Sequence, residues 1–128
     1  DKTYKTVKIG KQTWMAENLA YLPKVNPPTE GSETKPYYYV YSYEGTNVTE
    51  AKATDNYTTY GVLYNWTAAK KKKTCPKGWH LPSDAEWAEL INYFGGEDTA
   101  GGKLKETGRT HWNRNEGATN KSRFTILS

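Results

Sequence analysis

The chain has 128 residues, a length that suits one domain with a single hydrophobic core. Only 35% of the residues are hydrophobic, but five Trp and eleven Tyr predict a core that is built on aromatic rings. The net charge of +4 is modest, and no apolar run approaches the length of about 20 residues that crosses a bilayer, so no transmembrane segment is expected.

The first predicted element is a β-hairpin. Tyr4–Ile9 alternates between two faces, Gly10–Lys11 supplies a tight turn, and Gln12–Met15 supplies the partner strand. The segment that follows, Tyr21–Pro36, contains four prolines. Because proline interrupts both helices and central strands, this segment is expected to be a surface loop.

A run of tyrosines comes next. Tyr37–Tyr43 is β-prone and would place four tyrosines on one face of a strand. Such a ladder is either a ligand platform or a half-buried strand, and the structural interpretation is favoured because cross-strand aromatic pairs are ordinary sheet stabilisers. After it we expect a turn at Glu44–Asn47, a polar loop at Asp55–Thr59 and a short strand at Tyr60–Tyr64.

Four consecutive lysines, Lys70–Lys73, account for much of the net positive charge. Together with the nearby tyrosines they could form a basic, stacking surface for nucleic acid. The favoured interpretation is the solvated end of a helix over Asn65–Lys73, where positive charge suits the helix dipole. No nucleic-acid motif accompanies the run, so no nucleic-acid partner is expected.

The most informative stretch is Cys75–Trp87, which passes from a rigid turn into a helix. Ser83 and Glu86 have the spacing of a capping box. The predicted helix, Ser83–Phe94, has an apolar stripe at i, i+3, i+4 and i+7. That stripe consists of Trp87, Leu90, Ile91 and Phe94.

The rest of the chain gives weaker signals. Gly95–Gly96 should end the helix and Gly95–Gly102 should form a flexible connection. Leu104 is expected in a short strand or turn. Further on, Thr107–Asn120 is expected to form a Gly- and Asn-rich segment anchored by Trp112, and Arg123–Leu127 is predicted to be a strand.

Residues with catalytic or metal-binding chemistry are few. Cys75 is the only cysteine and is expected to be structural, because no partner with a recognisable nucleophile signature accompanies it. His80 and His111 lack zinc-ligand spacing, and Glu97–Asp98 lacks the pattern of a calcium loop. No nucleophile–base pair is legible, so the sequence predicts a protein that is not an enzyme.

Four segments in fixed order resemble the Fibrobacter succinogenes major paralogous domain. They are Val7–Leu19, Tyr60–Trp66, Cys75–Trp87, and Gly101–Gly108 with His111–Trp112. The resemblance spans nearly the whole chain, with Tyr37–Asn56 as a variable insert. It implies a single domain over residues 1–128 with a C-type lectin-like α+β fold of small antiparallel sheets and one or two helices. The motif residues to which it assigns structural roles are Trp14, Trp66, Cys75, Trp79, Ser83, Glu86 and Trp87.

Part of the capped segment, His80–Trp87, is also similar to a motif of formylglycine-generating sulfatase-modifying enzymes, which share that fold. Those enzymes use a cysteine pair, whereas Cys75 is alone, so their activity is not expected here. The sequence predicts no cofactor. Because many lectin-like domains hold calcium, Ca²⁺ is the one alternative.

Family members usually continue past the position of Leu127 with the last strands, which often carry the ligand site in lectin-like folds. The chain is therefore expected to be C-terminally incomplete, or to be completed by an oligomer or a partner chain. The resemblance also implies an extracytoplasmic bacterial protein, either secreted or an outer-membrane lipoprotein. Asp98–Thr99–Ala100 is similar to an O-glycosylation signal of secreted Bacteroidetes proteins, with Thr99 as the glycan acceptor.

Two functional classes follow from these expectations. The first is a non-catalytic binding or adhesion module at the cell surface that recognises a glycan or a protein through exposed aromatic side chains. Its candidate contact residues are Tyr38, Tyr41, Tyr43, Tyr57 and Trp112. The second is a structural or accessory subunit of a bacterial surface assembly, in which the same aromatic side chains are buried against neighbours.

Overall fold

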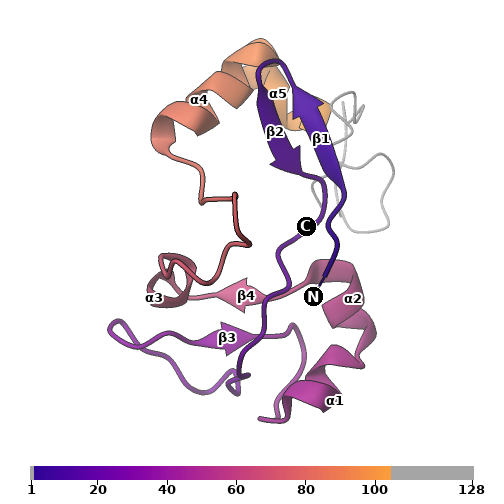
Figure 1. The fold of residues 1–128 in the computed structure, drawn as a ribbon, viewed down its shortest axis with the longest axis vertical. Helices are drawn as coiled ribbons and strands as arrows, with labels where there is room; N and C mark the ends of the chain where they lie inside the picture. Colours follow the sequence, from indigo (N-terminus) through magenta and orange to yellow (C-terminus); the bar gives the residue numbers. More distant parts are fainter. Residues whose placement is uncertain (1, 105–128) are drawn as a thin grey trace. The chain divides into compact units, whose positions relative to one another are not determined.

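The structure of the protein is a computed structural model that describes residues 2–104 (Figure 1). These residues divide into two compact units, one made of residues 2–17 and 82–104 and the other of residues 18–81. Each unit combines a two-stranded antiparallel sheet with short helices. The predicted α+β class with small antiparallel sheets is therefore confirmed. The segments predicted for residues 107–120 and 123–127, with Trp112 and His111, lie outside the described residues.

The predicted N-terminal hairpin is confirmed. Strands β1 (Thr6–Ile9) and β2 (Gln12–Met15) pair antiparallel, with Ile9 opposite Gln12 next to the turn. Gly10 adopts a φ of 61° in that turn, and a Cβ added to it would lie 3.1 Å from the ring of Tyr93. Both the backbone angle and the close approach of the ring therefore favour glycine at this position.

The predicted capped helix is also confirmed, as α4 (Asp84–Tyr93). The Ser83 hydroxyl accepts a hydrogen bond from the Glu86 amide at 3.2 Å, and the Glu86 carboxylate accepts one from the Ser83 amide at 3.0 Å. This reciprocal pair is the capping box that the sequence predicts. The helix ends at Tyr93 with Phe94 as its C-cap, and two glycines with φ values of 95° and 100° follow.

The prediction of a flexible connection over Gly95–Gly102 is wrong, because α5 (Glu97–Leu104) begins almost directly after α4. Leu104 is its last residue rather than part of a strand or turn. The helix forms despite its two internal glycines because local contacts compensate for their low propensity. Ala100 is buried, and the Thr99 hydroxyl donates to the Phe94 carbonyl oxygen at 2.7 Å.

The core of this unit combines the hairpin with α4 and α5. Its buried members are Ile9, Trp14, Leu90, Phe94 and Ala100. The apolar stripe that was predicted for α4 is confirmed at Leu90 and Phe94, whereas Trp87 remains 42% exposed. The Trp87 ring nevertheless packs on Trp14 at a centroid distance of 5.0 Å, so one face of the indole still contributes to the core.

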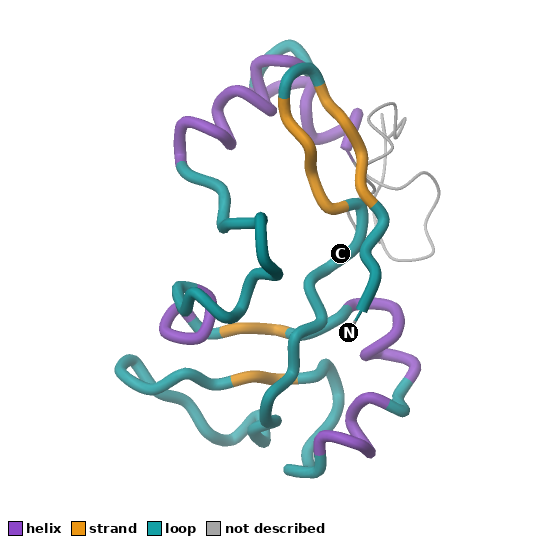
Figure 2. Tube along the Cα trace, in the orientation of Figure 1, coloured by secondary structure: helices purple, strands orange, loops and turns teal. Residues whose placement is uncertain are grey.

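The second unit contains β3 (Tyr38–Tyr39), α1 (Val48–Lys52), α2 (Asp55–Tyr60), β4 (Leu63–Tyr64) and α3 (Trp66–Ala69). Strands β3 and β4 pair antiparallel, with Tyr38 opposite Tyr64. Figure 2 shows that loops make up much of this unit and join its short helices and strands. Its core consists of Leu22, Val25, Tyr38, Val40, Ala51, Val62 and Ala68.

Three predictions for this unit are wrong in their extent or type. The tyrosine run forms a strand over only two residues, because the chain turns at Tyr41 and Ser42, where Ser42 has a φ of 61°. The expected polar loop Asp55–Thr59 is instead most of α2, which Thr54 caps by accepting a hydrogen bond from the Tyr57 amide. Tyr60 ends this helix, so the expected strand Tyr60–Tyr64 shrinks to β4.

The lysine-ended helix is shorter than predicted. Asn65 caps α3 as its side chain accepts a hydrogen bond from the Ala68 amide at 2.9 Å, but the helix ends at Ala69 rather than at Lys73. Lys70 is the C-cap, and Lys71, Lys72 and Lys73 lie in the turn that follows. The positive charge of these three residues is therefore not explained by the last turn of a helix.

The proline-rich segment Tyr21–Pro36 contains neither helix nor strand, as predicted, but it is more than a surface loop. It contributes Leu22 and Val25 to the core. Asn26, which is also buried, exchanges backbone and side-chain hydrogen bonds with Tyr38: its amide donates to the Tyr38 carbonyl oxygen, and its Oδ1 accepts from the Tyr38 amide. The segment therefore provides hydrogen-bond partners for the backbone amide and carbonyl groups of Tyr38 in β3, without itself forming a strand.

None of the described helices is long and apolar enough to span a membrane.

Candidate functional site

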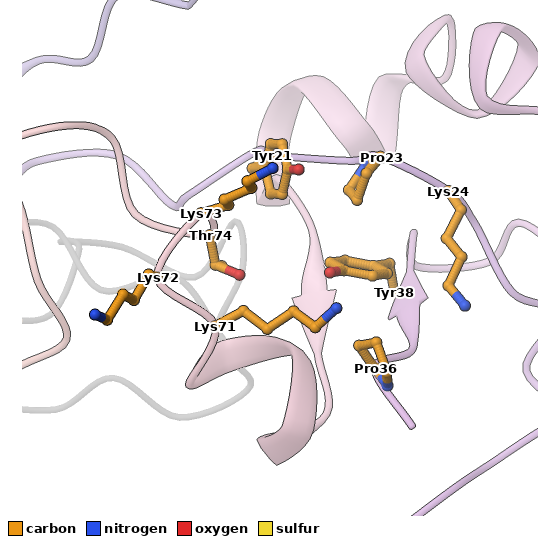
Figure 3. Close-up of a pocket in the computed structure, with 9 residues that line it drawn as sticks. All are labelled: Tyr21, Pro23, Lys24, Pro36, Tyr38, Lys71, Lys72, Lys73 and Thr74. Carbon is orange, nitrogen blue, oxygen red and sulfur yellow. The ribbon is translucent and has the colours of Figure 1, made fainter. Parts of the chain in front are cut away.

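A pocket of about 440 Å³ lies in the unit of residues 18–81 (Figure 3). We call it the tyrosine–lysine pocket. Three segments form it: the start of the proline-rich segment, strand β3 together with Pro36 shortly before it, and the turn after α3. It is lined by Tyr21, Pro23, Lys24, Pro36, Tyr38, Lys71, Lys72, Lys73 and Thr74.

Two tyrosine rings form the aromatic part of the pocket. Tyr21 and Tyr38 pack edge to face, with centroids 6.3 Å apart and an interplanar angle of 84°. Tyr38 is 3% exposed and is fixed on its other side by an edge-to-face contact with Tyr64 at 5.7 Å. Tyr21 is 37% exposed. Tyr38 is therefore a rigid wall, whereas Tyr21 presents ring surface that a ligand can reach.

A buried threonine holds the turn that carries the lysines. Thr74 is 1% exposed, and its hydroxyl donates to the Ala68 carbonyl oxygen at 2.6 Å. Its amide donates to the Lys71 carbonyl oxygen at 3.1 Å. The first hydrogen bond ties the end of the turn to α3 and the second closes the turn on itself, so the lysine side chains start from a fixed backbone.

The lysines do not all face the same way. Figure 3 shows the amino end of Lys71 directed toward Tyr38 and that of Lys73 directed toward Tyr21. Lys72 points away from both rings in the same view. Lys24 lies on the other side of the pocket, with its Nζ 5.3 Å from the ring centroid of Tyr37. Of the nine lining residues, four are lysines and none is acidic, so the pocket carries a positive potential.

Burial controls the ionisation of Tyr38, the residue that forms the rigid wall of the pocket. Desolvation raises the pKa of Tyr38 above its ordinary value, the neighbouring Tyr21 raises it further, and a hydrogen bond with the Thr74 side chain lowers it in part. The Tyr38 phenol therefore stays protonated at neutral pH. The pocket thus offers hydroxyl and ammonium groups beside aromatic and proline surfaces, which is the chemistry of a binding site for a polar ring compound.

The structure separates the residues that were predicted to contact a ligand. Tyr38 lines the tyrosine–lysine pocket, but as a buried core residue rather than an exposed one. Tyr43 and Tyr57 pack against the core of the unit; the Tyr43 hydroxyl accepts a hydrogen bond from the Asn47 amide, and the Tyr57 hydroxyl donates to the Ala20 carbonyl oxygen. Trp112 lies outside the described residues.

Tyr41 alone among the four described candidates stands mainly in solvent, at 59% exposed. Its ring packs edge to face on Tyr60 at 5.9 Å, and its carbonyl oxygen accepts a hydrogen bond from the Asn56 side chain at 3.1 Å. Tyr41 does not line the tyrosine–lysine pocket. It therefore forms a separate exposed aromatic surface within this unit.

Sequence reasoning missed Tyr21 and Thr74 and assigned the lysines to a helix end. The signal in the sequence that could have indicated this pocket is that the lysine run is followed directly by Thr74, and that tyrosines flank the proline-rich segment. It was weak because the three contributing segments are separated by many residues.

The motif residues with predicted structural roles differ in their burial. Trp14 is 9% exposed and Trp79 is half-buried, whereas Trp66 is 71% exposed. Cys75 is half-buried, and burial raises the pKa of its thiol, so the thiol is protonated at neutral pH. His80 is exposed and lies in the loop before α4.

The structure also places the predicted modification and metal residues. Thr99, the candidate glycan acceptor, lies inside α5 with its hydroxyl donating to the Phe94 carbonyl oxygen. Within residues 2–104 no three His, Cys, Asp or Glu side chains come together in a way that could hold a metal ion.

Comparison with known proteins gives one result at the family level. No curated protein and no solved structure matches the chain. The family model of the Fibrobacter succinogenes major domain matches residues 7–128, which include all of the hairpin but Thr6, the tyrosine–lysine pocket and the capped helix α4. The chain therefore belongs to the family of the Fibrobacter succinogenes major domain.

Proposed function

We propose that the protein is a non-catalytic binding domain that recognises a saccharide through the tyrosine–lysine pocket. One observation carries this proposal: a pocket of about 440 Å³ combines an accessible tyrosine ring, a rigid aromatic wall and several hydrogen-bond donors. Small-molecule sites commonly have volumes of about 300–1,000 Å³. The pocket is therefore large enough for a ligand of about one or two sugar rings.

The chemistry of a sugar ring matches these walls. One face of many pyranose rings carries C–H groups and packs on an aromatic ring, while the hydroxyl groups at the edge need hydrogen-bond partners. Tyr21 offers the accessible ring surface. Lys71 and Lys73 extend their amino groups toward the rings, and each ammonium group has three donors for hydroxyl oxygens.

The proposal includes the setting in which such a domain works. We infer a C-type lectin-like fold, because a hairpin, a capped helix and small antiparallel sheets are the parts that such a fold needs. We also infer an extracytoplasmic location, either secreted or as an outer-membrane lipoprotein, because this is where domains that resemble the chain are found. A saccharide-binding or adhesion role at the cell surface agrees with both inferences.

Binding measurements with matched tyrosine variants test the proposal. Wild-type protein, Tyr21→Ala and Tyr41→Ala would be titrated with a panel of polysaccharides by affinity electrophoresis, with circular dichroism to verify that each variant is folded. We expect Tyr21→Ala to weaken binding by about tenfold or more, because it removes the accessible ring of the pocket. Tyr41→Ala should bind as wild type, because Tyr41 does not line the pocket.

The reverse result would refute the pocket as the site. If Tyr41→Ala lost binding while Tyr21→Ala kept it, the exposed surface of Tyr41 and Tyr60 would be the platform. If neither the wild type nor the variants bound any saccharide of the panel, the saccharide function itself would be wrong.

One observation favours the alternative of a structural or accessory subunit in a surface assembly. Trp66 is 71% exposed and Leu63 is 52% exposed, and the two lie close together in the sequence in β4 and α3. Neighbouring exposed apolar side chains are typical of a surface that binds another protein. Light scattering after size-exclusion chromatography of concentrated samples tests this alternative. The wild-type protein should self-associate, whereas the Trp66→Ala variant should stay monomeric. A monomeric wild type would argue against self-assembly through this surface.

A further inference from the structure

We propose that the tyrosine–lysine pocket selects saccharides that carry negative charge, as carboxylate or sulfate groups. This inference rests on the proposed saccharide function and narrows its ligand class. It starts from the composition of the pocket, in which four of the nine lining residues are lysines and none is acidic.

Within residues 2–104, the charge of the three lysines after α3 has no structural partner. Helix α3 ends at Ala69, and Lys70 as its C-cap already places a positive charge at the end of the dipole. Lys71, Lys72 and Lys73 follow in the turn, and among the described residues none of the three forms an ion pair with a carboxylate. Three consecutive ammonium groups repel one another, so a bound anion would lower the electrostatic energy of the folded unit.

The side chains of Lys71 and Lys73 direct their positive charge into the pocket. Lys71 and Lys73 are separated by one residue and both reach toward the tyrosine rings, while the intervening Lys72 points away (Figure 3). This arrangement follows from the turn that Thr74 fixes through its hydrogen bond to Ala68. A charged substituent on a ring that packs on Tyr21 would therefore lie near two ammonium groups.

The identity of the cations decides how specific this recognition is. A lysine ammonium is a compact point charge, whereas an arginine fork pairs with a carboxylate through two parallel hydrogen bonds. The pocket contains lysines and no arginine among its lining residues. We therefore expect it to recognise the charge of the sugar rather than the shape of one anionic group, so that uronic acids and sulfated sugars both bind.

A nucleic acid also carries negative charge and rings that stack, but the pocket suits it less. Single-stranded nucleic acids are usually bound along a groove with successive aromatic platforms. In the tyrosine–lysine pocket only one of the two rings, that of Tyr21, is substantially exposed. The pocket therefore has room for one stacked ring and not for a row of bases.

Matched polymers test the inference on the full chain. Isothermal titration would compare polygalacturonate with the same polymer after reduction of its carboxyl groups, and dextran sulfate with dextran. We expect the charged polymer of each pair to bind at least about tenfold more tightly than its neutral partner, as a charge-assisted hydrogen bond adds about this much. Raising the NaCl concentration should reduce the difference, because salt screens exposed charges.

Matched charge variants localise the effect. The double variant Lys71→Gln with Lys73→Gln should lose the preference for the charged polymers. Its control, Lys8→Gln with Lys11→Gln, removes the same charge from exposed residues of the hairpin and should keep the preference. If the control lost the preference equally, the attraction would depend on net charge and the pocket assignment would be overturned.

The remaining outcomes are also decisive. Equal binding of charged and neutral polymers, with loss in Tyr21→Ala, would overturn the charge selection and leave the saccharide function intact. Binding of only one charged polymer would overturn the expectation that the lysines recognise charge irrespective of the anionic group that carries it. An absence of binding to every polymer would overturn both proposals, and tightest binding to an oligothymidylate of similar length would replace the saccharide with nucleic acid.

Discussion

Thr74 is the residue on which the position of the pocket lysines most depends. Its hydroxyl is buried and donates to the Ala68 carbonyl oxygen at 2.6 Å, in the last turn of α3. That oxygen has little access to water, since Ala68 is itself fully buried. The Lys71 amide also donates to this oxygen, at 3.3 Å, so loss of the Thr74 hydroxyl would remove one of its donors and the side-chain link between the end of the turn and α3.

This contact gives the first prediction. Thr74→Val keeps the volume of the side chain but removes the donor, so it should lower the free energy of unfolding by about 0.5–1.5 kcal/mol, the net contribution of one hydrogen bond. Thr74→Ser keeps the hydroxyl and should cost clearly less. Urea denaturation followed by circular dichroism measures both, and a larger loss in Thr74→Ser than in Thr74→Val would show that the methyl group matters rather than the hydrogen bond.

The second prediction concerns Tyr38 and pH. Burial raises the pKa of Tyr38 above its ordinary value of 10.0, so the folded protein holds the phenolic proton at pH values where the unfolded chain releases it. The resulting contribution to stability is complete below the unfolded pKa and is lost as the pH rises through the folded pKa. Stability should therefore fall at alkaline pH in part because Tyr38 must ionise.

Tyr38→Phe isolates this contribution. Denaturation midpoints would be measured between about pH 8 and about pH 11 for both proteins, with other tyrosines and the lysines titrating alike in each. The wild type should lose more stability than Tyr38→Phe across this range. If the stability of the two proteins fell equally with rising pH, the pKa of Tyr38 in the folded protein would not be raised by burial.

At the scale of single elements, α2 ends at a glycine that the backbone requires. Gly61 has a φ of 69° and a ψ of −136°, and a Cβ added there would lie 2.6 Å from the Leu19 carbonyl oxygen. Its amide also donates to the Tyr57 carbonyl oxygen, which closes the helix. Both the backbone angles and the fixed neighbouring backbone oppose any side chain at this position.

Gly61→Ala should therefore lower the free energy of unfolding by about 1–3 kcal/mol or more. Gly31→Ala is the matched control, because an added Cβ there meets nothing within 4 Å. The control should stay within about 0.5 kcal/mol of the wild type. Thermal and urea denaturation of both variants tests the pair, and a neutral Gly61→Ala would contradict the described path of the chain between α2 and β4.

The start of α4 gives a prediction of similar kind. Ser83→Ala removes the hydroxyl that caps the helix and should cost about 1 kcal/mol of stability. Ser83→Thr retains a capping hydroxyl and should cost less. Loss of equal stability in both variants, measured by urea denaturation, would show that the capping box contributes little.

Elements with local signals could be predicted from the sequence. The hairpin of β1 and β2 follows from alternation around Gly10, and α4 follows from its capping box and apolar stripe. Helix α2 could not be predicted from its own residues, because Asp55–Tyr60 is polar and has no apolar stripe. Its stability depends on packing, since Tyr57 lies against a core made of distant segments.

Two further errors have equally physical causes. Helix α5 contains Gly101 and Gly102, which oppose helix formation, and it is stabilised by the burial of Ala100 and by contacts to the Phe94 carbonyl oxygen. The tyrosine run was predicted as one strand because β-propensity says nothing of the turn at Ser42. In each case a contact from outside the segment, or one unusual backbone angle, decided the structure.

At the scale of the whole molecule, the candidate site illustrates the same limit. The tyrosine–lysine pocket unites residues near positions 21, 38 and 74, and only the fold of the 18–81 unit brings them together. The sequence predicts Tyr38 as a contact residue, but it could not indicate that Tyr21 and the lysines share one pocket with it. The family, by contrast, was predictable, because four motifs occur in fixed order along the chain.

The family membership and the pocket answer different questions. Membership in the family of the Fibrobacter succinogenes major domain identifies what the chain is related to. The function proposed above depends instead on the tyrosine ring, the buried wall and the lysines of one pocket. The central claim is therefore that a saccharide binds at the tyrosine–lysine pocket, and it can be tested residue by residue.

Amide chemical shifts measured during titration of the labelled protein with a galacturonate oligosaccharide test this claim most directly. We predict that the largest changes fall on the backbone amides of Tyr21, Tyr38 and the turn from Lys71 to Thr74, and that they saturate with added ligand. Changes centred on Tyr41 and Tyr60, or on Trp66, would contradict the claim, as would a spectrum that does not change at all.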